Sequence, residues 1–349
     1  MKIRFVTRIH TRNNFLLAVI SLLPIVIGFF FLDTMKLLSD IYFILLSLLI
    51  LLTLMSVSPL VFILFQETIQ AKWSKNLYPF FPDIRKYYKV LLVIWLIIFS
   101  LYNFFLLAAE LTYLAGRIWF YPLFIFFRTA IFLFSNLYIY NKVFPCYMTH
   151  SYESNLRKVS PFYLIFVISG IFFFSWDWMI FPLQNPHAGI VAIQTIITAF
   201  ALSVVSLIFF NRNKLRGSDL INDLSRYFLL FCCLWMYLFF CHLLISGYEG
   251  SMAISLIKSD LIIRILTIIL PIFLCFVFPF SLLSAYRNRI QVKKLAVASL
   301  SFFTGNFFWI LLFFSGRLDN NLIITLFLII LSAAFFFSLL RKYDNDMGT

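Results

Sequence analysis

Runs of about twenty apolar residues, separated by short charged segments, repeat along almost all of this 349-residue chain. A bilayer core about 30 Å thick takes about 20 apolar residues per helix. Hydrophobic residues make up 63 % of the sequence, against roughly 45–50 % in an ordinary soluble domain. Because backbone polar groups in lipid must be satisfied within the segment, such runs predict helices. The sequence therefore predicts an all-α integral membrane protein.

The spacing of the runs predicts about ten transmembrane helices and almost no soluble domain. Their expected residues are 15–32, 41–65, 87–108, 117–140, 160–181, 188–210, 226–247, 261–285, 293–315 and 320–340. Pro161 is expected in the first turn of its helix, where a missing N–H costs little. Four further prolines fall inside the runs and predict kinks that neighbouring helices can accommodate: Pro24, Pro59, Pro271 and Pro279.

The distribution of charge indicates how these helices are oriented. The 28 Lys and Arg residues outnumber the 14 Asp and Glu residues and give a net charge of +14. The Lys and Arg residues concentrate in every second loop and at both ends of the chain. Short cytoplasmic loops are enriched in Lys and Arg, so the alternation predicts cytoplasmic N- and C-termini. The loops on the opposite side carry only Lys36, Arg117, Lys258 and Arg317.

Several classes of protein are disfavoured by what the chain lacks. The loops between expected helices are too short for a soluble catalytic domain, and no P-loop, GxSxG or HExxH motif is present. The five cysteines form no CxxC pair. Of the four histidines, His242 alone falls inside an expected helix, whereas bis-histidine haem in the bilayer would need two. We therefore expect no metal site and no cofactor bound by this chain itself.

Ionisable residues deep in a bilayer are costly and face protein or water, so the few present are candidate site residues. Asp177 and His242 lie at equal distances along two helices that both run outward, roughly 24 Å from their cytoplasmic starts. Tyr237 is five residues before His242, and Arg128 is near the middle of helix 117–140. These four residues suit a proton path or a quinol contact. Alternatively, Asp177 pairs with Arg128 and holds two helices together.

Other polar and aromatic residues favour structural roles. Trp176 and Trp178 are typical of an interfacial aromatic belt rather than a ligand box. Two helices carry polar residues on one face that favour hydrogen bonds between helices, although they would also suit a water-filled path. These are Gln194 and Thr198 on one helix, and Ser301 and Thr304 on the other.

Three stretches carry motifs that point to a family. They contain a basic residue followed by Ser160-Pro161 and then Ser175-Trp176-Asp177-Trp178, next Asn185-Pro186-His187, and finally Asp223-Leu224, Trp235-Met236-Tyr237 and Cys241-His242. In this arrangement the chain resembles the ActF-type membrane subunit of bacterial alternative complex III. Asp177 matches that family's Phe-Asp-Trp motif and Tyr237 its Trp-x-Tyr motif, while His242 stands where the family has Gln.

The resemblance implies an NrfD/PsrC-like fold in the bacterial inner membrane. Two four-helix bundles would span residues 41–181 and 188–315, with helices 15–32 and 320–340 at the periphery. It also implies a cofactor-free subunit beside a sister NrfD-like membrane subunit, an iron–sulfur protein and multihaem cytochrome c subunits. Haem c and iron–sulfur clusters would belong to those partners, and quinol could contact this chain.

The hypothesis from sequence is thus a membrane subunit of a quinol-oxidising respiratory complex that holds redox partners and conducts protons. Asp177 would accept protons, with His242 and Tyr237 as relay. The alternative is a stand-alone proton-coupled transporter, which the scarcity of mid-membrane charge disfavours. A third hypothesis, an enzyme acting on lipid or isoprenoid phosphate, would need acidic pairs for Mg²⁺ or clustered basic residues at one interface, and it is the least favoured of the three.

Overall fold

The computed structural model describes residues 35–71, 73–80, 122–149, 153–180, 188–211, 220–248 and 268–314, together with residue 215 and most of 90–97. The expected helices 15–32 and 320–340 lie outside these residues, as does most of 87–108. Contacts divide the chain into two units, Met1–Ile44 with Arg317–Thr349, and Leu45–Gly316. The packing below concerns the second unit.

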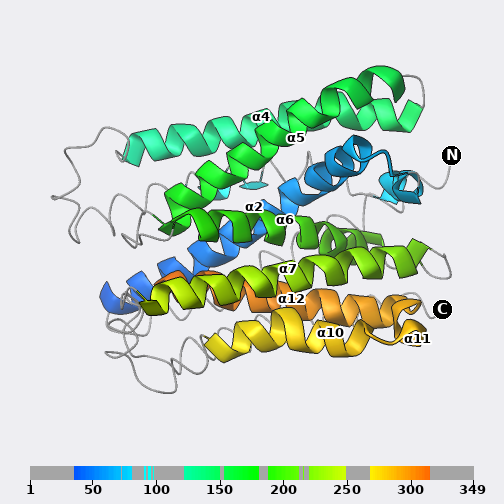
Figure 1. The fold of residues 1–349 in the computed structure, drawn as a ribbon. Coiled ribbons are helices and arrows are strands. Elements are labelled where there is room, and N and C mark those ends of the chain that lie inside the picture. Colours follow the sequence, from blue (N-terminus) through cyan, green and yellow to red (C-terminus); the bar gives the residue numbers. More distant parts are fainter. Residues whose placement is uncertain are drawn as a thin grey trace, which may run out of the picture. The chain divides into compact units, whose positions relative to one another are not determined.

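Every regular element of the described residues is a helix (Figure 1). In chain order they are α2 (Met35–Thr68), the 3₁₀ helix η1 (Trp73–Phe80), α4 (Pro122–Thr149), α5 (Glu153–Ser175), the π-helical turn η4 (Trp176–Ile180), α6 (Ala188–Asn211), α7 (Leu220–Tyr248), the π-helical turn η6 (Phe273–Val277), α10 (Phe278–Leu283), α11 (Tyr286–Arg289) and α12 (Val292–Phe314). Residues 268–272 are also α-helical and lead directly into η6.

Five of these helices are long and apolar enough to cross a membrane. The spans are Tyr42–Thr68, Lys158–Met179, Gly189–Asn211, Leu220–Ile245 and Val292–Leu311, and a shorter apolar helix covers Ile268–Leu283. Length and composition thus mark the chain as a multi-pass membrane protein with an all-helical described part, as the sequence predicts. The total of ten helices and the two-bundle arrangement stay predictions, because a large part of residues 81–121 lies outside the described residues.

Helix ends differ from the expected ones, and two site predictions change with them. Helix α5 begins at Glu153, so Pro161 lies about two turns inside it rather than in its first turn. Helix α4 spans Pro122–Thr149, which puts Arg128 in its second turn rather than near its middle. Helix α5 begins earlier than expected because hydropathy marks the bilayer, whereas a helix can continue beyond it. Helix α4 instead begins later than expected, at Pro122, and proline is favoured at the first position of a helix.

The second half of the described chain packs as a ring of four helical segments. Helix α6 packs on α7 and α12, and the segment from η6 through α10 packs on both α7 and α12. Helix α5 joins this ring to α4, because it packs on both α4 and α6 (Figure 1). Helix α2 contacts the ring through aromatic side chains, with Phe62 against Tyr227 at 5.1 Å and Phe65 against Phe200 at 5.1 Å between ring centroids.

The expected proline kink at Pro279 has an observable consequence in η6. The N–H of Phe278 donates to the carbonyl of Phe273, so the next carbonyl, of Leu274, would need an N–H from Pro279, which has none. The Ser301 hydroxyl of α12 donates to this Leu274 carbonyl at 2.7 Å. A side chain from a neighbouring helix therefore satisfies the backbone group that the proline leaves free.

Helix α12 approaches η6 closely because residue 305 is glycine. A Cβ built there would lie 2.5 Å from Cys275 Sγ and 2.8 Å from Leu274 Cβ. By contrast, a Cβ at Gly189, near the start of α6, would meet no atom within 4 Å. Close helix contact through a small residue is typical of membrane packing.

We expect Gly305→Ala to destabilise the protein by about 1–3 kcal/mol, because the added methyl group overpacks the contact with η6. Gly189→Ala is the matched control and should be neutral or slightly stabilising, since alanine favours a helix over glycine. Thermal unfolding of the two variants in mild detergent measures the difference. Equal midpoints for both variants would contradict the close packing of α12 on η6.

Ser301→Ala should destabilise by about 1–2 kcal/mol, because it leaves the Leu274 carbonyl unpaired in the protein interior. In a Pro279→Ala background the same change should cost much less, since residue 279 then has an N–H to offer that carbonyl. A double-mutant cycle of unfolding free energies measures this coupling. Additive effects of the two changes would contradict the proposed compensation.

Candidate functional site

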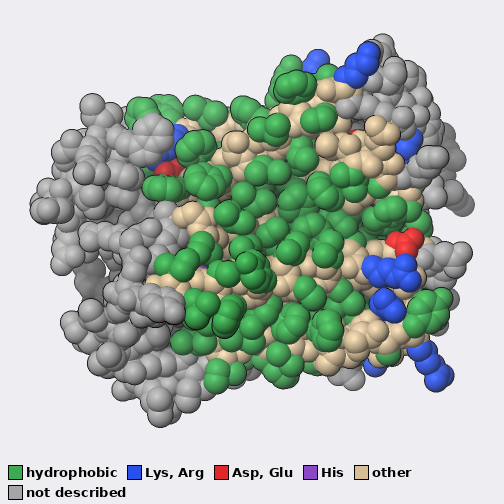
Figure 2. All heavy atoms as spheres, in the orientation of Figure 1, with side chains coloured by type: hydrophobic (Ala, Val, Ile, Leu, Met, Phe, Trp, Pro, Cys, Tyr) green, Lys and Arg blue, Asp and Glu red, His purple; other side chains and the backbone are tan. Residues whose placement is uncertain are grey.

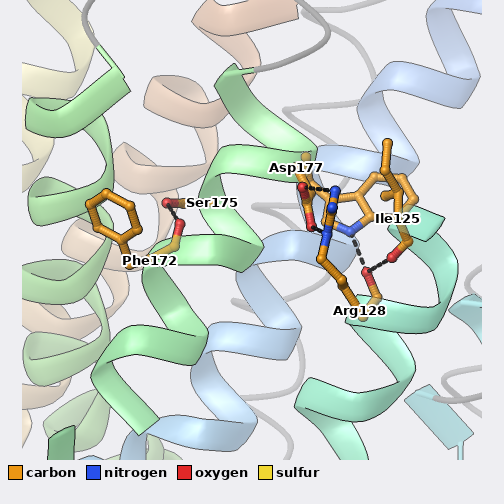
Figure 3. Close-up of polar contacts among 7 residues, drawn as sticks. Ile125, Arg128, Phe172, Ser175 and Asp177 are labelled. Carbon is orange, nitrogen blue, oxygen red and sulfur yellow. Dashed lines mark hydrogen bonds and ion pairs between the residues drawn. The ribbon is translucent and has the colours of Figure 1, made fainter. Parts of the chain in front are cut away.

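A buried ion pair between α4 and the end of α5 is the centre of the candidate site. Nε of Arg128 donates to Oδ2 of Asp177 at 2.9 Å, and Nη2 donates to Oδ1. The Asp177 side chain is 3 % exposed and that of Arg128 is 15 % exposed. The two planar groups therefore meet edge to edge, the geometry that gives arginine–carboxylate pairs both strength and direction (Figure 3).

The pair forms where two antiparallel helices bring their ends together. Arg128 lies in the second turn of α4 and Asp177 in the π-helical turn η4 that continues α5, and α4 packs along α5. In a π-helical turn each hydrogen bond encloses one more residue than in an α-helix, and such turns recur at functional sites. Figure 3 shows the carboxylate of Asp177 directed toward the guanidinium of Arg128.

Hydrogen-bonded aromatic residues fix the surroundings of the ion pair. The indole N–H of Trp178 donates to the Thr129 hydroxyl at 2.8 Å, and that hydroxyl donates to the carbonyl of Ile125 at 3.0 Å. Trp95 lies against Trp178, with ring centroids 4.4 Å apart, and its own N–H donates to Thr53 of α2 at 3.0 Å. Thr129 follows Arg128 and Trp178 follows Asp177, and these two residues are hydrogen-bonded to each other. The two helices are thus joined by the ion pair and by a second bond beside it.

These contacts test two of the predictions made from the sequence. The alternative in which Asp177 pairs with Arg128 and joins two helices is confirmed. The prediction that Trp178 belongs to an interfacial belt is wrong, because its side chain is fully buried and its N–H is bonded to Thr129 rather than to water or lipid headgroups. Trp176, one position before Asp177, is partly exposed, and its belt role stays a prediction.

The two remaining candidates lie on different faces of α7. His242 is 1 % exposed, whereas Tyr237 is 63 % exposed. Five positions along a helix separate side chains by roughly 140°, so the two residues do not face one another, and Tyr237 interacts with Cys241 one turn later. Among the described residues the partner of Asp177 is Arg128. The structure therefore brings together two of the four candidates, and the relay through His242 and Tyr237 stays a prediction.

A second polar cluster joins α6, α12 and η6. The Thr198 hydroxyl donates to Oδ1 of Asn306 at 3.0 Å, and Nδ2 of Asn306 lies 3.4 Å from Sγ of Cys275. The expected hydrogen bonds between helices are thus confirmed for Thr198, as they are for Ser301, while Thr304 bonds to its own helix at Leu300.

Gln194, one turn before Thr198, is fully buried. Its side-chain amide has no hydrogen-bond partner in the described part of the chain. The adjacent Thr195 hydroxyl lies 3.7 Å from the sulfur of Met179, two residues after Asp177. The second cluster therefore extends along α6 toward the segment that carries the ion pair.

Sequence reasoning missed Thr129, Asn306 and both π-helical turns. Thr129 was detectable as a hydroxyl next to the single arginine of an apolar run, and Asn306 as the one amide in its helix beside Gly305. The π-helical turns have no simple periodic pattern. All these residues orient helices or backbone, which explains why a search for titratable groups passed over them.

Within the residues that the structure describes, no group of three or more His, Cys, Asp or Glu could hold a metal ion. No family model matches this chain, and no curated protein matches it. A function for this chain must therefore be inferred from the residues of the candidate site.

Arg128→Leu should destabilise the protein by about 3–5 kcal/mol, because it leaves the Asp177 carboxylate buried without its partner. Arg128→Leu/Asp177→Leu should recover most of that loss, since it removes both charges. Unfolding free energies in detergent measure the two variants, with Lys158→Leu as a control at an exposed basic residue of α5. A double variant as unstable as the single one would contradict the mutual compensation of the two charges.

Proposed function

We propose that this chain is a membrane subunit of a quinol-oxidising respiratory complex of the alternative complex III type. It would hold redox partners in the membrane, and quinol oxidation would take place at least partly in those partners. The observation that carries the proposal is the position of Asp177. The acidic residue of the family-like motif is buried between helices and fixed by Arg128, as expected for a group retained at a cost inside a membrane.

In this proposal the primary role of the ion pair is to fix the end of α5 against α4. The segment that follows Asp177 packs on α6 and α12, so the pair also positions the junction between the first helices and the four-segment ring. A rigid junction of this kind suits a subunit whose task is to hold other subunits in register.

Proton transfer is the second part of the proposal. The carboxylate of Asp177 is the acidic group that the structure places at this junction, and accepting a proton would weaken both of its bonds to Arg128. The buried imidazole of His242 is a further candidate for the path. Tyr237 is exposed on α7 and is better placed to contact lipid, quinol or a partner subunit.

Purification of the tagged full chain in mild detergent tests the assembly. We expect c-type haem and iron–sulfur protein to copurify, detected by a haem stain and an iron assay, together with a second membrane protein of similar topology. A colourless protein without partners would contradict the proposal and favour the stand-alone proton-coupled transporter, to be followed by uptake assays.

Asp177→Asn tests the proton role within the assembled complex. The amide keeps the shape of the carboxylate and can still accept a hydrogen bond from Arg128, but it has no charge. In the complex that assembles with this variant we therefore expect at least a tenfold loss of quinol-driven proton release. Asp223→Asn is the matched control, since Asp223 is 43 % exposed at the start of α7. Unchanged quinol oxidation and proton release in Asp177→Asn would contradict a proton path through this residue.

A further inference from the structure

A cluster of cationic residues lies at the turn between α10 and α12. Arg287 and Arg289 belong to the short helix α11, and Lys293 and Lys294 belong to the first turn of α12. Figure 2 shows Lys and Arg side chains at the end of the molecule where Figure 1 places α11, beyond a broad hydrophobic surface. We call residues 286–294 the basic turn.

Hydrogen bonds hold the basic turn in one conformation. Nδ2 of Asn288 donates to the carbonyl of Leu282 at 2.9 Å, which ties α11 to the end of α10. The Ser225 hydroxyl of α7 donates to the carbonyl of Arg289 at 2.9 Å. The guanidinium of Arg289 also lies over the ring of Tyr286, 5.9 Å from its centroid. The bond to Ser225 places a further cation, Arg226, next to the turn.

The local electrostatics leave this cluster short of negative charge. Helix α12 has no acidic residue in its first turn, where the helix dipole favours anions and disfavours Lys293 and Lys294. The described acid nearby, Asp223, lies 3.8 Å from Arg226 in an exposed pair. Nε of Arg289 is buried without a hydrogen-bond partner in the described chain. An anion at the basic turn would balance these cations and offset the unfavourable interaction of Lys293 and Lys294 with the helix dipole.

An exposed apolar stripe leads along the 268–283 segment to the basic turn. Its side chains are between 43 % and 56 % exposed and follow one another at spacings of four, four and three residues: Ile269, Phe273, Val277 and Phe280. Such spacing puts them on one face of a helix. Tyr286 and Ile290, 60 % and 47 % exposed, continue the apolar surface among the cations, where aromatic residues typically meet the headgroup region.

We propose that the basic turn binds the phosphate headgroup of an anionic phospholipid whose acyl chains lie along this stripe. The positive-inside rule explains the sign of the charge, but it requires neither a hydrogen-bonded turn nor an apolar stripe that ends at it. A free phosphate would use the cations alone, whereas a lipid uses both features, and this continuity favours the lipid. The site is separate from the ion pair and does not depend on the proposed function.

Lipid titration of the purified full chain in mild detergent, followed by native mass spectrometry, tests the site. Dioleoyl phosphatidylglycerol should bind at least tenfold more tightly than dioleoyl phosphatidylcholine. Each cation near a membrane surface contributes about fivefold to the affinity for an anionic lipid. Loss of two cations in Lys293→Gln/Lys294→Gln should therefore weaken phosphatidylglycerol binding about thirty-fold. The control Lys142→Gln/Lys158→Gln neutralises two exposed lysines of α4 and α5. It should change the affinity for phosphatidylglycerol less than twofold. Unfolding midpoints confirm that both variants are folded.

Three results would overturn the proposal. The first is equal affinity for the two lipids, and the second is an equal loss of affinity in the control and the basic-turn variants. The third concerns the source of the phosphate. If inorganic phosphate at millimolar concentration displaces phosphatidylglycerol completely, the cations recognise a free anion and the apolar stripe has no role.

Discussion

A polar group inside a membrane is costly unless it finds a partner within the protein, because lipid offers none. Three features of this structure follow from that constraint. Arg128 neutralises Asp177 between α4 and α5, Ser301 satisfies the carbonyl that Pro279 leaves free, and Thr198 pairs with Asn306 between α6 and α12. The acyl chains of the bilayer are as apolar as the helices, so the hydrophobic effect does not drive helices together there. These hydrogen bonds, and close contacts such as that at Gly305, therefore select which helices pack together.

The sequence was sufficient for the helices because their signal is local. Apolar runs predicted α2, α5, α6, α7 and α12 near their observed positions. Helix ends were less predictable, as α5 shows, since the mostly polar residues 153–159 continue the helix outside the expected span. Hydropathy indicates which residues lie within the bilayer, but a helix can continue beyond the surface of the bilayer. Arg128 lies in the second turn of α4 rather than near the middle of the helix, because α4 begins at Pro122 and not at residue 117.

The residues of the candidate site were predictable from the sequence, but the sequence left open whether Asp177 pairs with Arg128 or forms a proton path with His242. Asp177 and Arg128 stand out because charges are rare in apolar runs. The partner of Asp177 depends on how α4 and α5 align, whereas an equal count of residues along the helices of Asp177 and His242 suggested that these two residues lie at the same depth. One further local feature, the π-helical turn η4, changes the direction in which residue 177 points, and no simple periodicity in the sequence encodes it.

The ion pair also limits how a proton could pass. If Asp177 takes up a proton, Arg128 keeps its charge in a position that is 15 % exposed, and an uncompensated charge there is strongly unfavourable. Protonation must therefore be coupled to a second event, either the arrival of another anion near Arg128 or a movement of α4 relative to η4. Because Trp178 is bonded to Thr129 beside the pair, such a movement would break a second bond between the same two elements. The stable state is thus a closed junction, and proton transfer through it would have to occur by its transient opening.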